Sequence, residues 1–471
     1  MIATPWRALI VMCLANFLVV LDTSIVNTAA PDMMSSLGAG INEILWVLNG
    51  YLLAFAALLI VFGRLGDLAG PRALFTTGLG VFTAASVLCG LSQDLASLVA
   101  ARVLQGVGAA MLVPQALVLI VGIFPPTRRG AAFGVFTAVA GIAAVGGPTL
   151  SGLLVTHLGW QWIFFLNAPA GLAGMLLAFR LVPALRPGIR HRFDWLGVIF
   201  ASLGLTGVVY GLIEGQRHDW GTIAGAFSLP LVFGVSSVLL VAFVVWERHA
   251  TEPLIPLELF RGRNYRIATL ITLILSFALY GFLLVFVLET QTVLGMSPVM
   301  SGVSALPWTL TLCALAPVAG RLTDRVGGRG LLVAGLATYA VGVLGMAVLP
   351  TASSTGGTLT LPLVVVGIGQ GMTFSPATTE AMRDIPPAQN GAASGVLNTA
   401  RQVGAALGAA VVGAVLQNRM AAGSDVLSAA RPALGVVAGA VLLGCVLAAF
   451  MVRNRPQLTA GRKHPGGQDT A

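Results

Sequence analysis

Long apolar runs alternate with short polar connections along almost the whole chain. Each run is about as long as the 20 residues that a helix needs to cross a bilayer. Fourteen such runs lie near residues 8–29, 44–62, 73–92, 96–120, 131–153, 162–182, 195–214, 224–246, 267–289, 301–319, 330–350, 359–381, 392–416 and 433–452. The pattern predicts an all-α polytopic membrane protein with about fourteen transmembrane helices.

Two related decapeptides show that the chain contains an internal repeat. GRLGDLAGPR at 63–72 follows the second apolar run, and GRLTDRVGGR at 320–329 follows the tenth. A second pair of segments, PPTRRGAAFGV at 125–135 and PPAQNGAASGV at 386–396, repeats at a separation of 261 residues, against 257 for the decapeptides. Such a repeat is typical of transporters built from two related halves.

The positions of the decapeptides predict how the chain is divided. A plain duplication of six helices would place the second decapeptide after the eighth run, so two additional helices must lie between the halves. We expect an N-terminal six-helix bundle over 1–183, two linker helices with basic cytoplasmic flanks over 184–266, a C-terminal six-helix bundle over 267–453 and a disordered cytoplasmic tail over 454–471.

The composition agrees with a surface that faces the lipid bilayer. Hydrophobic residues make up 57% of the chain and charged residues 9%, with a mean hydropathy of +0.91. Soluble domains carry about 25% charged residues. The net charge of +9 comes from basic residues scattered singly through short connections. Without a basic stripe and interleaved aromatic residues, nucleic acid is excluded as a partner.

The residues that build metal, nucleotide and catalytic sites do not occur in the required patterns. The four cysteines lie far apart inside apolar runs, and the five histidines fall in connections or in the tail. No GxxxxGK[ST] loop is present, and Lys463 is the only lysine. The sequence therefore predicts no metal, no cofactor, no ATP and no enzyme activity, and the expected energy source is an ion gradient.

The basic residues indicate the orientation of the chain in the membrane. If the N-terminus is cytoplasmic, 21 Lys and Arg residues lie in cytoplasmic segments, and only Arg217, Arg419 and Arg431 lie on the other side. The positive-inside rule then places both termini in the cytoplasm, which requires an even number of helices. The bias towards Arg, Ala, Gly and Val indicates a high-GC bacterial genome, so we expect a multi-pass protein of the bacterial cytoplasmic membrane.

Asp22 and Arg102 are charged residues inside apolar runs. A charge at the centre of a membrane helix costs about 2.5–3.5 kcal/mol. At 1.5 Å per residue, both residues lie roughly 10 Å from the outer ends of their runs, so they can pair across a central cavity. A carboxylate there can bind either a proton or a cationic substrate, and competition between the two is the simplest mechanism of antiport. The alternative is that Asp22 only caps or hydrogen-bonds helix ends within a packed bundle.

Seven motifs occur in a fixed order along the chain. They are LDTSIVNTAAP at 21–31, the decapeptide at 63–72, RVLQGVGAA at 102–110, GIAAVGGPTLSG at 141–152, WQWIFFLNAP at 160–169, DWLG at 194–197 and NTARQVGAALG at 398–408. Together they resemble the major facilitator superfamily, specifically its fourteen-helix drug:proton antiporter family. The resemblance implies the major facilitator fold with a 6 + 2 + 6 arrangement. It also assigns Arg102 to a position associated with proton coupling, with a structural bond to carbonyl groups as the alternative.

Four further residues are candidates for a substrate cavity. Asn27 belongs to the helix 1 motif, and Gln105 lies one turn beyond Arg102 on the same side of its helix. Glu289 lies near an outer helix end, where it is either an interface residue or a group that attracts cations. Arg401 lies inside helix 13 without an acidic residue in that helix, and a structural role is the other interpretation.

The two decapeptides are interpreted as gating loops on the cytoplasmic side. The residues that carry this interpretation are Gly63, Asp67, Arg72, Gly320, Asp324 and Arg329. Contacts of the aspartates with arginines and helix ends can hold the inner side shut, and breaking them lets it open. Glycines there allow neighbouring helices to approach closely. The alternative is that the arginines only set the membrane topology.

The fifth run is rich in glycine and proline, with Gly141, Gly147, Pro148 and Gly152. Proline removes a backbone donor and glycine removes side-chain bulk, so the sequence predicts a kinked, closely packed helix at the boundary between the halves. In the family that the chain resembles, this motif marks exporters rather than importers. The direction of transport therefore rests on analogy.

The sequence as a whole predicts a monomeric, proton-coupled efflux antiporter that works by alternating access. The expected substrates are amphipathic, often cationic drugs or antibiotics, and self-resistance of an antibiotic producer fits the composition. One alternative is a transporter of the same fold for a lipid, a siderophore or an anionic metabolite, for which Arg102 and Arg401 leave room. Another is a membrane-embedded sensor or enzyme, which the lack of a catalytic cluster or soluble domain disfavours.

Overall fold

The computed structural model describes residues 5–185, 194–218, 220–225, 227–351 and 356–452. The predicted tail over 454–471 lies outside this part of the chain. The first half of the described chain forms α1 (Pro5–Leu37), α2 (Ile41–Ala69), α3 (Pro71–Leu91), α4 (Leu95–Ile123), η1 (Pro126–Arg128), α5 (Arg129–Leu158), α6 (Trp162–Phe165) and α7 (Asn167–Leu181). The last two helices make up one span, from Trp162 to Leu181, that is interrupted at Leu166.

The second half also contains six spans, but here the fourth span, and not the sixth, is interrupted. It consists of α10 (Arg263–Leu288), the π-helix η4 (Glu289–Val293), α11 (Pro298–Ser304), α12 (Leu306–Val326), α13 (Gly328–Val348), η5 (Gly356–Leu359), α14 (Thr360–Gly371), α15 (Phe374–Met382), η6 (Pro387–Gln389), α16 (Asn390–Ala421) and α17 (Val426–Ala449). Here α14 and α15 together form the interrupted span.

The segment between the halves contains two helices and the only sheet in the described residues. It comprises α8 (Trp195–Glu214), η2 (Gln216–His218), β1 (Thr222–Ala224), β2 (Phe227–Ser228), α9 (Leu229–His249) and η3 (Leu257–Arg261). The prediction of a helix from residue 224 was wrong at its start, because Gly225 adopts a φ of 54° and turns the chain into a hairpin. The helix begins only at Leu229.

The prediction of about fourteen membrane-spanning helices is confirmed. Thirteen spans in the described residues are long and apolar enough to cross a membrane. The fourteenth is α12, a helix of 21 residues whose last turns carry Arg321, Asp324 and Arg325. These charges lower its mean hydropathy without shortening it.

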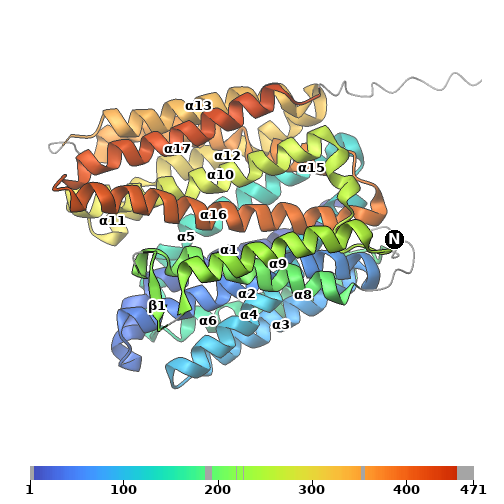
Figure 1. The fold of residues 1–471 in the computed structure, drawn as a ribbon, viewed down its shortest axis with the longest axis horizontal. Helices are drawn as coiled ribbons and strands as arrows, with labels where there is room; N and C mark the ends of the chain where they lie inside the picture. The colour runs from blue at the N-terminus through green and yellow to red at the C-terminus, as the bar shows by residue number, and fades with distance from the viewer. Residues whose placement is uncertain (1–4, 186–193, 219, 226, 352–355, 453–471) are drawn as a thin grey trace, which may run out of the picture.

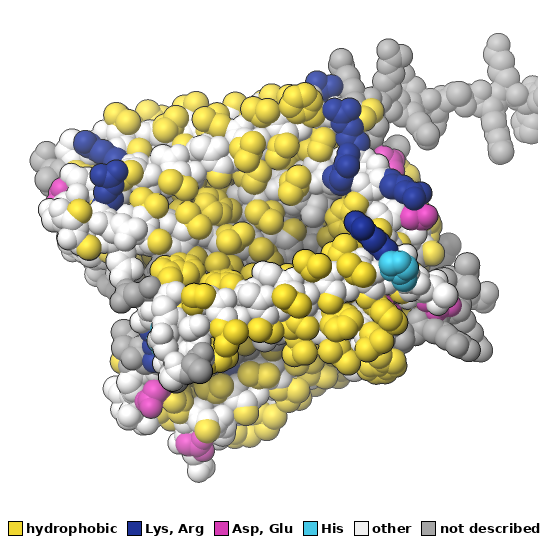
Figure 2. Space-filling model, viewed as in Figure 1, with side chains coloured by type: hydrophobic (Ala, Val, Ile, Leu, Met, Phe, Trp, Pro, Cys, Tyr) yellow, Lys and Arg dark blue, Asp and Glu magenta, His cyan; other side chains and the backbone are white. Residues whose placement is uncertain are grey.

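The helices run nearly parallel in two groups (Figure 1). Most helices of the first half, drawn in blue to cyan, lie in the lower group together with the linker helices α8 and α9, in green to yellow-green, and those of the second half, in yellow-green to red, make up the upper group. Between the groups, α5 packs against α12 and α2 packs against α16. The linker pair α8 and α9 packs together, with α8 against α2. Figure 2 shows hydrophobic side chains covering the flanks of the bundle and most charged ones near its ends, as a protein in a bilayer requires.

Both decapeptides lie at the same end of the bundle, which we call the motif end. The chain also enters and leaves there. Trp6 at the start of α1 packs on Phe124 at the end of α4, with ring centroids 5.2 Å apart. Val452 after α17 exchanges two hydrogen bonds with Asn264 at the start of α10, at 2.8 and 3.2 Å.

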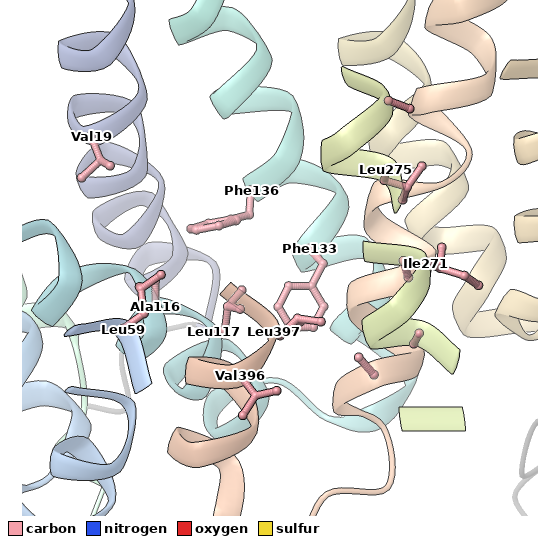
Figure 3. Packing of buried hydrophobic residues seen from close by; sticks show 14 of the residues in the cluster. Val19, Leu59, Ala116, Leu117, Phe133, Phe136, Ile271, Leu275, Val396 and Leu397 are labelled. Atoms are coloured by element: carbon pink, nitrogen blue, oxygen red, sulfur yellow. The ribbon is translucent and has the colours of Figure 1, made fainter. Parts of the chain in front are cut away.

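One hydrophobic core extends across both groups near the motif end. Phe133 and Phe136 of α5 lie among residues of α4 and α16, including Leu117 and Leu397 (Figure 3). All four side chains are almost completely buried. The two halves are therefore held together there by apolar packing, in addition to the polar contacts described below.

The internal repeat is visible in how the helices approach one another. A Cβ atom on Gly108 of α4 would lie 2.5 Å from the backbone nitrogen of Phe82 in α3. The corresponding Gly369 of α14 is pressed in the same way against the backbone of Tyr339 in α13. Both helix pairs pack backbone to backbone, which only a residue without a side chain allows.

Changing Gly108 or Gly369 to valine is expected to lower the free energy of unfolding by about 1–3 kcal/mol, because the added side chain must push two backbones apart. Gly439→Val in α17 is the matched control, since nothing lies within 4 Å of a Cβ atom there. Denaturant titration in detergent micelles measures the difference. Equal stability of the three variants would contradict the close packing of α3 on α4 and of α13 on α14.

Candidate functional site

Asp22 of α1 and Arg102 of α4 form an ion pair in the interior of the first half. Arg102 Nη1 lies 2.5 Å from Asp22 Oδ2. Asp22 is 2% exposed and Arg102 is not exposed at all. The predicted pairing of the two charges is therefore confirmed. The prediction that they pair across a central cavity is wrong, because both belong to the first group of helices and are enclosed within it.

The carboxylate of Asp22 is satisfied by two amide side chains as well. Gln105 Nε2 donates to Asp22 Oδ1 at 2.8 Å, and Asn167 Nδ2 of α7 donates to the same oxygen at 3.1 Å. Asn167 also donates to Ser86 Oγ at 3.0 Å, and Ser86 donates to the carbonyl of Phe164 at 2.9 Å. This buried polar network joins α1, α3, α4 and α7.

The guanidinium of Arg102 is held on its other sides too. Its Nε donates to the carbonyl of Val47 in α2 at 3.0 Å, and its Nη1 donates to Gln105 Oε1 at 2.7 Å. Its Cζ lies 4.3 Å from the centroid of the Tyr51 ring, a cation–π contact. A buried charge is tolerated when it is paired and hydrogen-bonded in this way. We call Asp22, Arg102, Gln105, Asn167 and Ser86 the Asp22 network.

Asn167 and Ser86 were not predicted from the sequence. Asn167 lies inside an apolar run, within the motif WQWIFFLNAP. An isolated amide in a membrane span could have identified it as a candidate. Ser86 gives no such signal, because a serine in a span usually bonds to its own helix. Only the fold brings its hydroxyl to α7.

The second half contains a different kind of charged residue at Arg401 of α16. Its Nη2 donates to Thr378 Oγ1 at 2.7 Å, and its Nη1 lies 3.4 Å from Asn398 Oδ1. Its Nε is buried without a hydrogen-bond partner. No ion pair joins Arg401 to a carboxylate in the described residues.

The remaining cavity candidates do not lie together with Asp22. Asn27 is exposed and donates to the carbonyl of Thr23 at 2.8 Å, so its amide is bound within α1. Glu289 begins the π-helix η4, is 3% exposed and has one carboxylate oxygen, Oε2, without a partner. Of the four predicted cavity residues, only Gln105 belongs to the Asp22 network.

Asp67 in the first decapeptide binds the start of a helix in the other half. Its Oδ1 accepts from Gly391 N at 2.8 Å and its Oδ2 accepts from Ala392 N at 3.1 Å, in the first turn of α16. These amides have no partner within their own helix. A carboxylate at a helix N-terminus is also favoured by the helix dipole. We call this contact the Asp67 latch.

The second decapeptide makes the reciprocal contact. Asp324 Oδ1 accepts from Gly130 N at 2.8 Å and Oδ2 accepts from Ala131 N at 3.0 Å, in the first turn of α5. We call this contact the Asp324 latch. The two latches are related by the internal repeat, because each joins a decapeptide of one half to a PP-x-x-x-G segment of the other.

Glycines bring the latch helices into backbone contact. A Cβ atom on Gly63 would lie 3.0 Å from the Cα of Gly395, and one on Gly320 would collide with the carbonyl of Gly130. The arginines of the decapeptides serve different contacts. Arg64 is buried with Nη1 3.8 Å from Asp67 Oδ2, Arg72 donates to the carbonyl of Phe179, and Arg329 is exposed.

The glycine-rich helix α5 lies between the two halves. Gly141 faces α12, since a Cβ atom there would lie 2.7 Å from Cys313 Sγ. Gly147 is pressed against Ser24 of α1, whereas Gly152 has nothing within 4 Å of a Cβ position. Close packing at the boundary between the halves is confirmed for Gly141 only, because Gly147 packs on α1 within the first half. The helix continues through Pro148 without a break in its assignment.

Two hydroxyl groups tie α5 to the part of α1 that carries Asp22. Ser24 Oγ donates to the carbonyl of Ala144 at 2.9 Å, and Ser151 Oγ donates to the carbonyl of Ile25 at 3.0 Å. Direct contacts therefore connect Asp22, through α1 and α5, with α12. A second route leads from Arg102 through Val47 of α2 to α16.

Burial along α16 and α5 differs between their two ends. On α16, residues 390–400 are all buried, and residues 401–403 are partly exposed. On α5, residues 130–134 are buried, whereas positions 142, 144, 146 and 149 are exposed. The structure is therefore closed at the motif end and looser towards the opposite end.

Two other features concern possible binding sites. A pocket of about 410 Å³ at the motif end is lined by Arg263, Glu380 and Asp384, among others, and extends to Pro386 and Gln389 next to the Asp67 latch. In the described residues, no three His, Cys, Asp or Glu side chains gather where they could hold a metal ion.

Comparison with known proteins gives a consistent result. Residues 12–409 match the family model described as Major Facilitator Superfamily. The chain is 36% identical to the tetracenomycin C resistance and export protein of Streptomyces glaucescens, over 88% of this chain and 77% of that one. It is 37% identical to the cephamycin export protein of Amycolatopsis lactamdurans, over 87% and 85%.

A solved structure confirms the fold. The human organic anion transporter MFSD10 superposes with a TM-score of 0.67, over 94% of this chain and 99% of that one. The two sequences are 15% identical, so this likeness concerns the arrangement of helices alone.

Proposed function

Since the chain belongs to the major facilitator superfamily, we propose that it exports amphipathic antibiotics or drugs in exchange for protons. Two relatives that share more than a third of its residues are named as export proteins for antibiotics. It is a multi-pass protein of the bacterial cytoplasmic membrane, and the family to which it belongs comprises transporters rather than enzymes.

The observation that carries the proton-coupling proposal is the Asp22 network. It is a buried, hydrogen-bonded ion pair inside a membrane span, and intramembrane ionisable residues are functional by default. When Asp22 takes up a proton, the ion pair is lost and Arg102 needs another partner. Because α1 contacts α5 and Arg102 contacts α2, the rearrangement acts on two of the helices that touch the second half.

We place the motif end in the cytoplasm, on the evidence of the 21 basic residues predicted on that side. The structure is then closed towards the cytoplasm by the Asp67 and Asp324 latches. Alternating access requires both latches to break while the opposite end closes. This sequence of events couples proton uptake to the release of the substrate outside.

The partners of Asp22 and Glu289 bear on the charge of the substrate. The expectation of cationic substrates rested on a carboxylate that can bind them, and Asp22 is committed to Arg102, Gln105 and Asn167 in this state. Glu289 is the remaining candidate for attracting a cation, because its Oε2 has no partner. The transport assay below uses a cationic probe to test that expectation.

The test is the movement of ethidium into everted membrane vesicles, with ethidium fluorescence and internal pH followed together. We expect wild-type vesicles to accumulate ethidium only while a pH gradient is present, and to release protons as they do so. Asp22→Asn is expected to reduce this movement to that of vesicles without the protein, because its side chain cannot take up the proton. The matched control is Asp32→Asn, an exposed position on the same helix, which is expected to leave transport unchanged.

Three results would change the proposal in different ways. Full coupling in Asp22→Asn would place the proton site elsewhere, with Glu289 as the next position to change. If the vesicles exchange protons for an anionic or neutral compound and move no ethidium, the proposed antiport stands and the proposed cationic substrate class is wrong. Ethidium movement that does not respond to the pH gradient would show that transport is not coupled to protons.

A further inference from the structure

Arg401 lies deep inside a membrane span. It is in the part of α16 that starts at Asn390, about 16 Å from the beginning of the helix at 1.5 Å per residue. The whole segment from Pro387 to Ala421 has the length and hydropathy of a membrane span. An arginine in such a place needs hydrogen-bond acceptors, and preferably a negative charge, to be tolerated.

The acceptors that surround Arg401 are few and neutral. Guanidinium carries five N–H donors, and two contacts are made, to Thr378 Oγ1 and to Asn398 Oδ1. The Nε donor is buried and has no acceptor. By contrast, Arg102 in the first half has a carboxylate, an amide oxygen and a backbone carbonyl. The positive charge of Arg401 is therefore not compensated within the described residues.

The nearest carboxylates on neighbouring helices are committed or far away. Glu380 of α15 accepts from Gly328 N at 2.7 Å and pairs with Arg383 at 2.6 Å. Glu289 of η4 continues α10, whose Leu273 and Phe277 contact Gly404 and Gly408 of α16. This register places Glu289 beside residue 420 or so, about 28 Å along the helices from Arg401.

Arg401 also marks a boundary along α16. The eleven residues before it, 390–400, are all buried in the closed contact at the motif end. Residues 401–403 are the first on this helix that are partly exposed. A molecule that enters between the halves from the opposite end therefore meets Arg401 where the closed contact begins.

We propose that Arg401 binds an acidic oxygen of the exported molecule, a carboxylate or a phenolate. A guanidinium binds such groups through two parallel charge-assisted hydrogen bonds, for which it has unused donors here. The substrate then supplies the negative charge that this half lacks. The inference rests on the proposed export function and adds to its substrates amphipathic molecules that carry an acidic group, alone or together with a basic one.

The test is equilibrium binding to the purified full-length protein in detergent micelles, read by fluorescence anisotropy. The probes are carboxyfluorescein, which is anionic, and ethidium, which is cationic. We expect Arg401→Gln to raise the Kd for carboxyfluorescein about 10- to 100-fold, as the loss of hydrogen bonds to a charged group implies. Ethidium binding is expected to change less than twofold.

Two further variants separate recognition from folding. Arg401→Lys keeps the positive charge but loses the planar fork, so an intermediate weakening of about 3- to 10-fold is expected for carboxyfluorescein. Arg419→Gln, an exposed position later on the same helix, is expected to change neither Kd. If Arg401→Gln elutes as an aggregate, Arg401→Lys is compared with wild type in its place.

The outcomes distinguish this inference from the export function. If wild-type protein shows no saturable carboxyfluorescein binding, or if Arg401→Gln and Arg401→Lys bind it as tightly as wild type, Arg401 has only a structural role. Ethidium transport driven by a pH gradient would then leave the export function intact. If carboxyfluorescein binding depends on Arg401 but no vesicle transport is found with either probe, the binding site stands and the export function fails.

Discussion

Replacement of Arg102 by glutamine is expected to abolish proton-coupled transport and to lower the free energy of unfolding by about 3–5 kcal/mol. Removing one partner of a buried ion pair costs this much because the other charge stays buried without its partner. Asp22 would remain 2% exposed, with the amides of Gln105 and Asn167 as its donors and no positive charge beside it. A glutamine cannot replace the charge, nor reach both Asp22 and the Val47 carbonyl as the guanidinium does.

The double variant with Asp22→Asn and Arg102→Gln gives the sharper result. It contains no buried charge at this place, and neutral replacements of buried ion pairs are often as stable as the pair itself. We expect it to regain most of the lost stability in denaturant titration while transport remains absent. A stability equal to the sum of the two single losses would show that the two side chains do not act on each other.

The control for this experiment is an ion pair at the surface. Arg261 lies 3.7 Å from Glu258, and the two side chains are 83% and 70% exposed. Arg261→Gln should cost less than about 1 kcal/mol, because solvent screens such a pair. If Arg102→Gln is no worse than Arg261→Gln, the Asp22 network is not what holds α1, α4 and α7 together.

The parts of the structure that could be predicted are those that depend on one helix at a time. Membrane spans follow from apolar length, and the depths of Asp22 and Arg102 follow from counting residues along their runs. Their pairing was therefore within reach of the sequence. That the pair is enclosed within one half, and does not line a cavity, depends on how α1, α4 and α7 pack together. No pattern along a single helix contains that information.

The contacts of the two latches also could not be predicted from the sequence. The sequence contains two repeated motifs in each half, and Asp67 and Asp324 were expected to act through arginines and helix ends. In the structure both bind backbone amides at helix starts, those of Gly391 and Gly130, which belong to the second repeated motif of the opposite half, and Asp67 also lies 3.8 Å from Arg64. Backbone donors have no sequence signature of their own. The repeat indicated that these segments matter, but only the fold shows that one motif binds the other.

The hairpin between α8 and α9 was missed for a local reason. Residues 222–228 read TIAGAFS, and their apolar side chains extend the following run without a charge or a proline. Gly225 could have indicated a turn, and its φ of 54° is the conformation in which glycine is favoured. Ser228 followed by Pro230 could have indicated the start of the helix. Single glycines are so frequent in the membrane spans of this chain that the signal carries little information by itself.

Loss of both latches is expected to open the motif end. Asp67→Asn and Asp324→Asn each remove the negative charge that two helix amides share, which is worth about 1–2 kcal/mol at a helix N-terminus. Each variant should therefore raise the population of the open state about tenfold, and the double variant about 100-fold, since the latches lie on different helix pairs. Transport should fall, because a protein that stays open at the motif end cannot complete the cycle.

The rate of thiol labelling at the motif end measures this opening. Ser394→Cys is introduced into protein whose four native cysteines are replaced by alanine, because Ser394 lies beneath the Asp67 latch, is not exposed and donates to the carbonyl of Pro114. Asp94→Asn is the matched control. Asp94 also caps a helix, with Oδ1 accepting from Ser97 N at 2.8 Å, but α4 begins at the opposite end. It should lower stability slightly and leave the labelling rate as it is.

The two single variants also test whether the halves move as rigid bodies. If they do, α2 cannot leave α16 without α12 leaving α5, and either substitution accelerates the labelling of Ser394→Cys equally. If the latches open separately, only Asp67→Asn exposes Ser394, because Asp324 contacts α5 and not α16. Unchanged labelling in the double variant would mean that the apolar contacts of Phe133, Phe136 and Leu397 hold the motif end closed by themselves. The carboxylates would then set the orientation of the helices without controlling their separation.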